Sequence, residues 1–542
     1  HCSAAPRAGP ADFCRVGRLL RQPHPAEEQT MAMPVLASEA SKGKGVMLFA
    51  CGSRGDVQPF VALAAGLVRA GFRALVLTNA NHVDFVGGFG LEACEVYPDT
   101  QEMIKSAPRL LECMKNGDFF LLFKLLAEVG KEIFPKSLRQ ALDAAERFKP
   151  DVILFGGLWM TGAAAVGAVH GVPACYCDFA GVMPSGSTSS FLAEPLWWPS
   201  LAHRALNRLL AWAMVKSERE GKHAAIADVC PEVMPDIPKN LEQLEITDEF
   251  RQGPMLIGTS SLLVQQAKDW AWDPVVTGPW VIGPEEQAQR MGRREEHFAG
   301  ADALGLEAFL LAGPPPVYVG WGSMVCVSSE FMACTAIRAL KLASLRGVVL
   351  GGWAELGPES LRAQPDGDAL LDYAAKHVFF TRTAAHEWLF PRCAAIVHHG
   401  GAGTTAAAMR SGRPAVITPC GFDQPLNAKR VAATGAGLAL PRLAKVTPEQ
   451  LAAAMRRVVD DKAMVARAAE VGKALRAEDG VANAVRALDD FVANEVVTGT
   501  WAVHAERRRE LMRKYESPSL FTKIGFLCAK LCTNSIKSQV RW

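Results

Sequence analysis

The sequence predicts an α/β protein built from two doubly wound domains, each around a parallel sheet. Short apolar segments of strand character alternate with helix-like segments along most of the 542 residues. Three consecutive prolines at 314–316 interrupt this alternation, which starts again directly after them. The chain is also too long for one ordinary domain, so two domains with terminal extensions are expected.

The first domain begins where a proline- and alanine-rich stretch gives way to a buried strand at residues 46–51. A glycine-rich turn, a periodic helix at 58–70 and a second strand at 72–78 follow. Strand, helix and strand in this order form a βαβ unit, which requires parallel strands. Two further strands are predicted at 151–155 and 173–177.

The second domain repeats this rhythm after the proline break. Its predicted strands lie at 317–320, 347–350, 377–381, 394–398 and 415–418. Proline and glycine are frequent just before it, which predicts a linker. The expected organisation is a disordered segment at 1–45, a first domain at 46–272, a linker at 273–316, a second domain at 317–490 and a helical tail at 491–542.

Composition argues against several classes of protein. The formal net charge of +2 does not favour nucleic-acid binding. The 14 cysteines lack the paired spacing of zinc sites, and their scatter favours a reducing cytosol over a disulfide scaffold. No apolar run reaches the roughly 18 residues of a transmembrane helix. These features predict a cytoplasmic protein that needs no metal.

Aromatic side chains concentrate in one part of the first domain, residues 191–214. Trp197 and Trp198 stand there among leucines and prolines. Such a concentration is typical of a pocket lining, and it is equally typical of ordinary core packing. The sequence leaves both interpretations open, and Trp197 and Trp198 are candidate acceptor contacts.

The most informative segment spans residues 394–406, where a strand ends in two histidines and a glycine-rich turn opens a helix near Thr404. Small residues let a phosphate approach the backbone, and the N–H groups of the first helical turn stabilise its charge. His399, just before the glycines, could donate to a phosphate oxygen. His398 would point to the opposite face of the strand, and we expect it to be packed.

The same glycines also match a dinucleotide fingerprint. Residues 401–406 satisfy GxGxxG/A, and Asp423 lies 20 residues after Gly403. A dinucleotide fingerprint normally follows the first strand of its domain, whereas this one follows several strands. Two histidines precede it, and Gln424 follows Asp423 as a pair suited to vicinal hydroxyls. A dehydrogenase is therefore the less favoured interpretation.

Three segments of the second domain resemble the donor site of sterol 3-beta-glucosyltransferases, which belong to the UDP-glycosyltransferases of the GT-B fold. They are 386–393, 399–405 and 421–425, while Gly52-Ser53-Arg54-Gly55-Asp56-Val57-Gln58-Pro59 resembles the N-terminal signature of that family. The resemblance covers residues 46–490. It implies two Rossmann-like domains that face each other across a cleft, an acceptor-binding domain at 46–272 and a nucleotide-sugar-binding domain at 317–490.

The resemblance also implies roles for individual residues. His399 and the backbone after it would hold the diphosphate of a UDP-sugar, Asp423 and Gln424 would bind the sugar hydroxyls, and residues 383–386 would lie beside the uracil. The implied donor contacts are Ser323, His386, His399, Gly401, Ala402, Gly403, Thr404, Asp423 and Gln424. No cofactor is implied, because the UDP-sugar is a co-substrate.

The sequence departs from the family at three places. Ala385 replaces the usual proline before His386, and the loop 420–422 differs slightly from its usual form. In the first domain Asn79 stands where relatives commonly have a histidine, and His82 lies three residues on. Asn79 and His82 are therefore further candidate acceptor contacts.

Asp56 is the candidate general base. It follows the first strand, at the edge where a doubly wound sheet presents its ligand crevice. A carboxylate there could take the proton of an acceptor hydroxyl as the oxygen attacks the anomeric carbon, which inverts its configuration. The alternative is that Asp56 only caps the following helix. Its neighbour Arg54 could orient Asp56, bind a phosphate or serve structure alone.

Two remaining features have simpler explanations. Asp366-Gly367-Asp368 matches the DxD pattern of metal-dependent glycosyltransferases but lies in a proline- and glycine-rich stretch, so a solvated turn is expected. The apolar and basic residues from about 520 to the end could touch a membrane surface peripherally, although a terminal helix packed on the first domain is favoured.

Three functions are consistent with these observations. The first is transfer of a hexose, glucose by resemblance, from a UDP-sugar to a sterol-like lipid. The second keeps the fold but changes the acceptor to another lipid or a small polycyclic natural product. The third is a protein that binds sugar nucleotides or lipids without catalysis.

Overall fold

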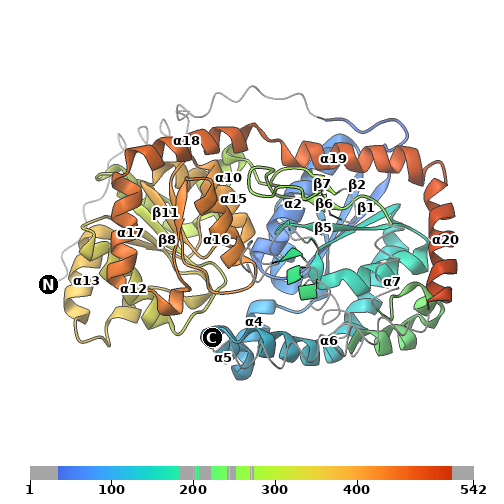
Figure 1. Ribbon diagram of the computed structural model, residues 1–542, viewed down its shortest axis with the longest axis horizontal. Coiled ribbons are helices and arrows are strands. Elements are labelled where there is room, and N and C mark those ends of the chain that lie inside the picture. The colour runs from blue at the N-terminus through green and yellow to red at the C-terminus, as the bar shows by residue number, and fades with distance from the viewer. Residues whose placement is uncertain are drawn as a thin grey trace.

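The computed structural model describes residues 35–181, 185, 199–200, 202–203, 205–206, 221–240, 243, 252–268, 270 and 274–515. Two parallel sheets lie side by side in Figure 1, which confirms the predicted pair of doubly wound domains. Trp197, Trp198 and the chain beyond 515 lie outside the described residues. No helix within these ranges is both long and apolar enough to cross a membrane.

The first sheet has seven strands in the order β3-β2-β1-β4-β5-β6-β7, all parallel. The strand order reverses between β1 and β4, and ligands bind at such a switch point in open α/β sheets. The strands are β1 (Gly45–Ala50), β2 (Arg73–Asn79), β3 (Glu92–Tyr97), β4 (Val152–Phe155), β5 (Ala174–Asp178), β6 (Leu256–Ile257) and β7 (Val275–Val276).

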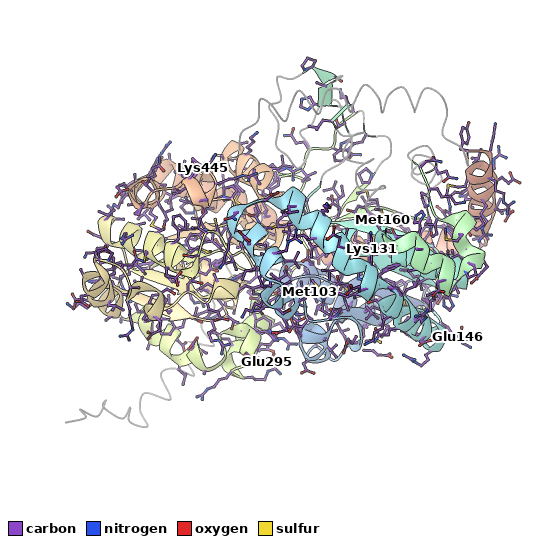
Figure 2. The ribbon with its side chains drawn as sticks, turned by 90° about the horizontal axis from the view of Figure 1, so that it is seen from below. Met103, Lys131, Glu146, Met160, Glu295 and Lys445 are labelled. Atoms are coloured by element: carbon purple, nitrogen blue, oxygen red, sulfur yellow. The ribbon has the colours of Figure 1, made fainter. Side chains whose placement is uncertain are left out.

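Alternate residues of β1 serve two different cores, as the period of a buried strand requires. Leu48 packs with α2 on one face of the sheet, while Phe49 packs with α6 and α7 on the other. Figure 2 shows Lys131 and Glu146 along the length of α6. The helices of this domain are α2 (Arg54–Ala70), α3 (Val83–Gly87), α4 (Thr100–Ser106), α5 (Pro108–Asn116), α6 (Phe119–Phe148) and α7 (Met160–His170).

The second sheet has six parallel strands in the order β10-β9-β8-β11-β12-β13. Its switch point lies between β8 and β11, so the loops after these two strands open at one place. The strands are β8 (Val317–Gly320), β9 (Gly347–Leu350), β10 (Val378–Thr381), β11 (Ala395–His398), β12 (Ala415–Ile417) and β13 (Gly437–Ala439).

Helices cover both faces of the second sheet, and α12 packs on α17 while α15 packs on α18. They are α12 (Ser329–Leu342), α13 (Gly367–His377), α14 (His386–Leu389), α15 (Ala402–Arg410), α16 (Gln424–Ala433), α17 (Pro448–Asp460) and α18 (Lys462–Ala477). The predicted solvated turn at 366–368 is only partly correct, because Gly367 begins α13 and Arg338 Nε donates to Asp366 Oδ2 at 2.9 Å.

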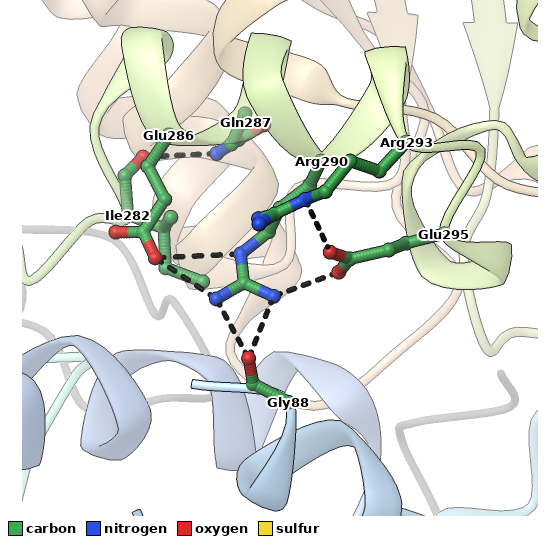
Figure 3. A network of polar contacts seen from close by, with 7 residues as sticks. All are labelled: Gly88, Ile282, Glu286, Gln287, Arg290, Arg293 and Glu295. Atoms are coloured by element: carbon green, nitrogen blue, oxygen red, sulfur yellow. Dashed lines mark hydrogen bonds and ion pairs between the residues drawn. The ribbon is translucent and has the colours of Figure 1, made fainter. Parts of the chain in front are cut away.

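The region predicted as a linker is largely structured, which corrects that expectation. Val275 and Val276 form β7 of the first sheet, and α10 (Pro284–Gly292) and α11 (Ala303–Leu311) follow. Both terminal nitrogens of Arg290 on α10 donate hydrogen bonds to the Gly88 carbonyl at 3.1 Å. The same guanidinium forms ion pairs with Glu286 and Glu295 (Figure 3). Its buried guanidinium needs these partners, so the segment is fixed on the first domain.

The same segment also binds the second domain. Gln287 of α10 accepts a hydrogen bond from the Glu387 backbone N–H at 3.2 Å, and Ala299 N–H donates to Thr383 Oγ1 at 3.1 Å. Buried apolar side chains continue from α2 through Phe298 to Phe390 of the second domain. The two domains therefore share a core across their interface.

The chain returns to the first domain earlier than residue 490. α18 lies over the second domain, whereas α19 (Gly480–Phe491) packs on α2, as the long helical path across the top of Figure 1 shows. Gly480 sits so close to the backbone of Gly278 that a methyl group there would lie 2.4 Å from the Gly278 oxygen. α20 (Thr500–Lys514) then packs on the first domain, where Arg509 Nε donates to Asp236 Oδ1 at 2.8 Å.

Candidate active site

The turn after β1 presents Asp56 at the switch point of the first sheet. Gly52 has φ +130, and a methyl group on it would lie 2.5 Å from Asp56 Oδ2, so glycine is required there. Asp56 Oδ2 accepts hydrogen bonds from the Ser53 backbone N–H at 2.7 Å and from Ser53 Oγ at 2.9 Å. Ser53 is thus the N-cap of α2, and Asp56 completes a capping box from inside the first turn, not as the cap residue that was the alternative; this uses only one of its two carboxylate oxygens.

Asp56 also faces the second domain. Its side chain is reached by solvent, yet protein surrounds it on most sides, and this desolvation raises its pKa above the usual value. Its charge is among those that raise the pKa of Asp423 on the far side of the interface. α2 and α15 are in contact with each other, so the two predicted motifs meet in one place.

Asn79 supports this turn instead of lining the space in front of it. The side chain is completely buried, with Oδ1 accepting from the Gly52 N–H at 2.7 Å. Its Nδ2 donates to the Pro98 carbonyl at 3.0 Å and to Thr100 Oγ1 at 2.5 Å. The prediction of Asn79 as an acceptor contact is wrong, because its amide is already used by its neighbours.

His82 is also buried. Its ring is only 6% exposed, and burial, with nearby His297 and Arg54, lowers its pKa to about 4. Arg54 covers this region by donating to the His297 carbonyl at 2.5 Å and by stacking over Phe298 at 5.0 Å. Both ring nitrogens of His82 are buried without a hydrogen-bond partner among the described residues, and its role as an acceptor contact stays a prediction.

On the donor side, β11 ends at His398, and His399 follows it directly; both side chains are buried. His398 is fully buried and its Nδ1 accepts the Gly400 N–H at 3.1 Å, which confirms the predicted packed histidine. His399 fits only because its neighbours are glycines. A methyl group would lie 2.5 Å from its Nε2 at Gly401 and 3.1 Å from its Cε1 at Gly322.

His399 is neutral at physiological pH, since burial lowers its pKa to about 4. Its Nδ1 is buried and has no hydrogen-bond partner among the described residues. Thr405 Oγ1, one turn into α15, is in the same condition. Buried polar atoms without partners are rare in folded proteins, so this concentration marks a place that can accept a polar ligand.

The amino end of α15 is open toward this place. Gly401 precedes the helix without a side-chain cap in the described structure, and Gly403 is exposed. The backbone N–H groups of Ala402, Gly403 and Thr404 therefore keep the donor capacity that every helix start leaves over. Free N–H groups and the helix dipole are what an anion needs, and the binding of a phosphate here stays a prediction. Ser323, after β8, is half-buried.

The loop before α16 holds Asp423 in place through its neighbours. Asn427 Nδ2 donates to Asp423 Oδ2 at 2.9 Å and to the Gly400 carbonyl at 2.8 Å, which ties this loop to the glycine turn. Burial, with the charges of Asp178 and Asp56, raises the pKa of Asp423 to about 6. Within the described residues no cluster of three or more His, Cys, Asp or Glu could hold a metal ion.

Gln424 differs from its prediction. Its side-chain Oε1 accepts the backbone N–H groups of Cys420 at 2.8 Å and Gly421 at 3.0 Å, and the residue is 3% exposed. The carbonyl half of this amide is thus used to shape the loop. Of the side-chain amide that was predicted to bind sugar hydroxyls, only Nε2 remains for a ligand.

His386 lies in an aromatic group at the interface. Its ring stacks on Phe390 with centroids 4.5 Å apart, and its Nε2 lies 3.3 Å from the Tyr318 hydroxyl. Burial and the nearby charge of Arg54 lower its pKa to about 3. The ring is therefore neutral, and its contacts orient it from the second domain toward the first.

Sequence reasoning missed Asp178 and Arg430. Asp178 ends β5 at the same sheet edge as the turn of Asp56, and Arg430 follows Asp423 by seven residues on α16. The sequence could have indicated Asp178, because the strand ends of a parallel sheet share one edge. It could have indicated Arg430, because positions i and i+7 of a helix share one face.

Comparison with known proteins identifies the family. Residues 46–169 match the glycosyltransferase family 28 N-terminal domain, and residues 381–490 match the erythromycin biosynthesis protein CIII-like C-terminal domain. O-mycaminosyltylonolide 6-deoxyallosyltransferase of Streptomyces fradiae is 30% identical over 84% of the chain and 99% of its own length. The chain belongs to the UDP-glycosyltransferase family.

Sterol 3-beta-glucosyltransferases are also among the relatives. Two from Arabidopsis thaliana are 29% and 26% identical over 82% and 90% of the chain. The chain spans 64% of the length of the first and 74% of the second, and 36% of a third from Eremothecium gossypii.

Solved structures support the same fold for this glycosyltransferase. The calicheamicin glycosyltransferase CalG4 has a TM-score of 0.54 at 19% identity, covering 83% of this chain and 99% of its own. The glycosyltransferase of kitacinnamycin has a TM-score of 0.53 at 19% identity, covering 83% and 98%. These likenesses establish the GT-B arrangement of two Rossmann-like domains.

Proposed function

We propose that this UDP-glycosyltransferase moves a hexose, glucose, from a UDP-sugar to the hydroxyl of a sterol-like lipid with inversion. The observation that carries the proposal is the contact between α2, which holds Asp56 in its first turn, and α15, which begins after His399 in the other domain. It brings a candidate base within reach of a candidate sugar site beside an anion-binding helix terminus. The sterol 3-beta-glucosyltransferases among the relatives support the sugar and the acceptor.

In this mechanism Asp56 removes the proton from the acceptor hydroxyl as the oxygen attacks the anomeric carbon. The new C–O bond forms on the face opposite the diphosphate, and the old bond breaks with its electron pair leaving on the phosphate oxygen. The raised pKa of Asp56 makes its carboxylate a stronger base than a solvated one. Its bonds to Ser53 through Oδ2 leave Oδ1 to take the proton.

The departing diphosphate gains negative charge, and the second domain can stabilise it. The neutral imidazole of His399 can donate one N–H, and the start of α15 offers the backbone N–H groups of 402–404. Ser323 opens onto the same switch point. Asp423 and the Nε2 of Gln424 would hold the sugar hydroxyls.

A second acceptor class has an observation in its favour. The relative from Streptomyces fradiae is named for transfer to O-mycaminosyltylonolide, and the chain spans 99% of it, against 64% of the first sterol relative. A small polycyclic natural product is therefore the alternative acceptor. A protein that binds the donor without transfer is the third outcome to be tested.

The test is product mass spectrometry with the full chain. Purified protein is incubated with UDP-glucose, UDP-galactose or dTDP-glucose and with a sterol mixture, a total lipid extract or a macrolide panel. A mass gain of one hexose on the sterol, dependent on UDP-glucose, supports the proposal. Transfer to macrolides alone would assign the second acceptor class, and UDP binding by calorimetry without any product would reject catalysis.

A further inference from the structure

Arg430 lies on the face of α16 that is directed at the interface between the domains. Asp423, Asn427 and Arg430 are spaced i, i+4 and i+7, which places them on one side of a helix. Asn427 bonds to Asp423 and to the Gly400 carbonyl, so this side faces the candidate donor site. Arg430 continues that row by one further turn.

The guanidinium of Arg430 reaches into the first domain. Its Nη1 donates to the Ala180 carbonyl, and its Nη2 donates to the Gly181 carbonyl at 2.9 Å. The turn that it holds has little freedom, because Gly181 has φ +59 and a methyl group there would lie 2.5 Å from Val264 Cγ2. Two consecutive carbonyls on one planar fork define both the distance and the angle of the contact.

The held turn carries a carboxylate that faces the site. Asp178 ends β5, and its Oδ1 accepts the Ala180 N–H at 3.0 Å. Its charge acts on Arg430 and on Asp423, and the charge of Asp56 acts on Asp423 as well. Arg430 is thus the cation beside carboxylates that come from both domains.

We propose that Arg430 is a positioning residue of the transfer reaction, which latches the turn after β5 onto α16 and so holds the facing carboxylates of the two domains in register. This inference rests on the proposed function. It concerns the geometry of the closed cleft, and not the identity of sugar or acceptor. A guanidinium suits the task because it keeps its charge when buried and forms both bonds at once.

The experiment compares the wild-type chain with Arg430→Ala and Arg430→Lys. Amide hydrogen exchange of a peptide covering residues 174–181 should become faster in Arg430→Ala, and less so in Arg430→Lys. The kcat of hexose transfer should fall by about tenfold to hundredfold in Arg430→Ala, the range expected when a reacting group is displaced by about an ångström. The Kd for UDP should stay within about twofold, since UDP is not a partner of Arg430 in the proposed mechanism.

The pH profile separates positioning from plain loss of structure. Asp178 and Asp56 raise the pKa of Asp423, Asn427 donates a hydrogen bond to it, and the charge of Asp423 in turn acts on Arg430. Removing the cation should raise the pKa of Asp423, so the acid limb of kcat should move to higher pH in Arg430→Ala. Arg430→Lys keeps the charge and should leave the limb in place.

The matched control is Lys105→Ala. Lys105 pairs with Glu355 at 2.5 Å and also joins the two domains, but both side chains are exposed, so its loss should change neither exchange nor kcat. Unchanged exchange in Arg430→Ala, or faster exchange with unchanged kcat and pH profile, overturns the latch. If the wild-type chain transfers no sugar, the proposed function fails, while the exchange data still decide whether the turn is held.

Discussion

The turn that carries Asp56 and the glycine turn before α15 differ in how completely their polar groups are bonded. On the acceptor side, Asn79 uses its whole amide to fix the turn, and Asp56 bonds twice to Ser53. On the donor side, His399 Nδ1 and Thr405 Oγ1 are buried without partners in the described structure. The turn of Asp56 fixes one carboxylate rigidly, whereas the glycine turn leaves buried polar atoms whose hydrogen bonds a ligand could supply.

The largest expected effect comes from the carboxylate on the rigid side. Asp56→Asn should lower kcat by roughly 10²–10⁴-fold, because the amide can keep the bonds to Ser53 but cannot accept the proton. The Kd for UDP, measured by calorimetry, should not change. Undiminished turnover would leave Asp56 with its capping role alone.

A matched variant separates capping from catalysis. Asp461 caps α18 by accepting the Met464 N–H at 3.0 Å, and it is not part of the candidate site. Asp461→Asn should leave kcat unchanged, because asparagine caps a helix as well as aspartate does. A similar loss of activity in both variants would point to a defect in folding.

Donor binding should be sensitive to substitution of the glycines around His399. Gly401→Ala would place a methyl group 2.5 Å from His399 Nε2, so the ring must move. We expect the Kd for UDP to rise by roughly tenfold to a hundredfold, the equivalent of one or two lost hydrogen bonds to a charged group. Gly130→Ala on α6, where an added methyl group also meets nothing within 4 Å, is the control. Equal affinities in the two variants would contradict the assigned place of His399.

Asn79 supports the turn that carries Asp56, so its removal should first be seen as a loss of stability. Asn79→Ala leaves the Gly52 N–H without its partner in a buried place, which should cost about 1–3 kcal/mol in the free energy of unfolding. Thermal or urea unfolding measures this change. The kcat should fall with the Kd for UDP unchanged, because the turn that carries Asp56 loosens. Full activity together with full stability would mean that Asn79 does not hold the turn.

The smallest effect concerns the charge of Asp423. Its pKa is raised from 3.8 to about 6, so the folded state binds this proton more tightly than the unfolded chain. Its contribution to stability is greatest below pH 4 and declines as pH rises to about 6. Asp423→Asn should therefore stabilise the protein by about 1–2 kcal/mol at pH 7 and hardly at all at pH 4, as thermal unfolding can measure.

Asp372, a carboxylate whose pKa is lowered and not raised, is the control for the direction of this stability change. Lys376 lowers the pKa of Asp372 on the surface of α13. Asp372→Asn should lose stability at neutral pH, if it changes at all. A gain in stability for both variants at pH 7 would show that removing any carboxylate has this effect, and that Asp423 is not special.

Several features could be predicted because they depend on short stretches of chain. Buried strands at 46–51 and 394–398, and the glycine turn before Thr404, follow from local pattern alone. The helix over Arg54–Ala70 begins four residues before its predicted start at 58, since Ser53 and Asp56 cap it earlier. Boundaries of this kind depend on single hydrogen bonds, which periodicity does not reveal.

Other predictions failed where distant partners decide the role of a side chain. Asn79 and Gln424 have the residue types of ligand contacts, but Gly52 and the 420–421 loop use their amides. The supposed linker folds because Arg290 and Gln287 find partners in both domains. Nothing in the order of residues states which of these contacts forms.

The sequence by itself determined two Rossmann-like domains, an uncapped helix start after His399 and a carboxylate after the first strand, because each follows from hydrophobic period, glycine and helix-end chemistry. Only the tertiary structure decided that Asp56, Asp178 and Asp423 share one electrostatic environment, with Arg430 among them. Charges interact through space and not along the chain, so their pairing exists only once the domains have closed on each other.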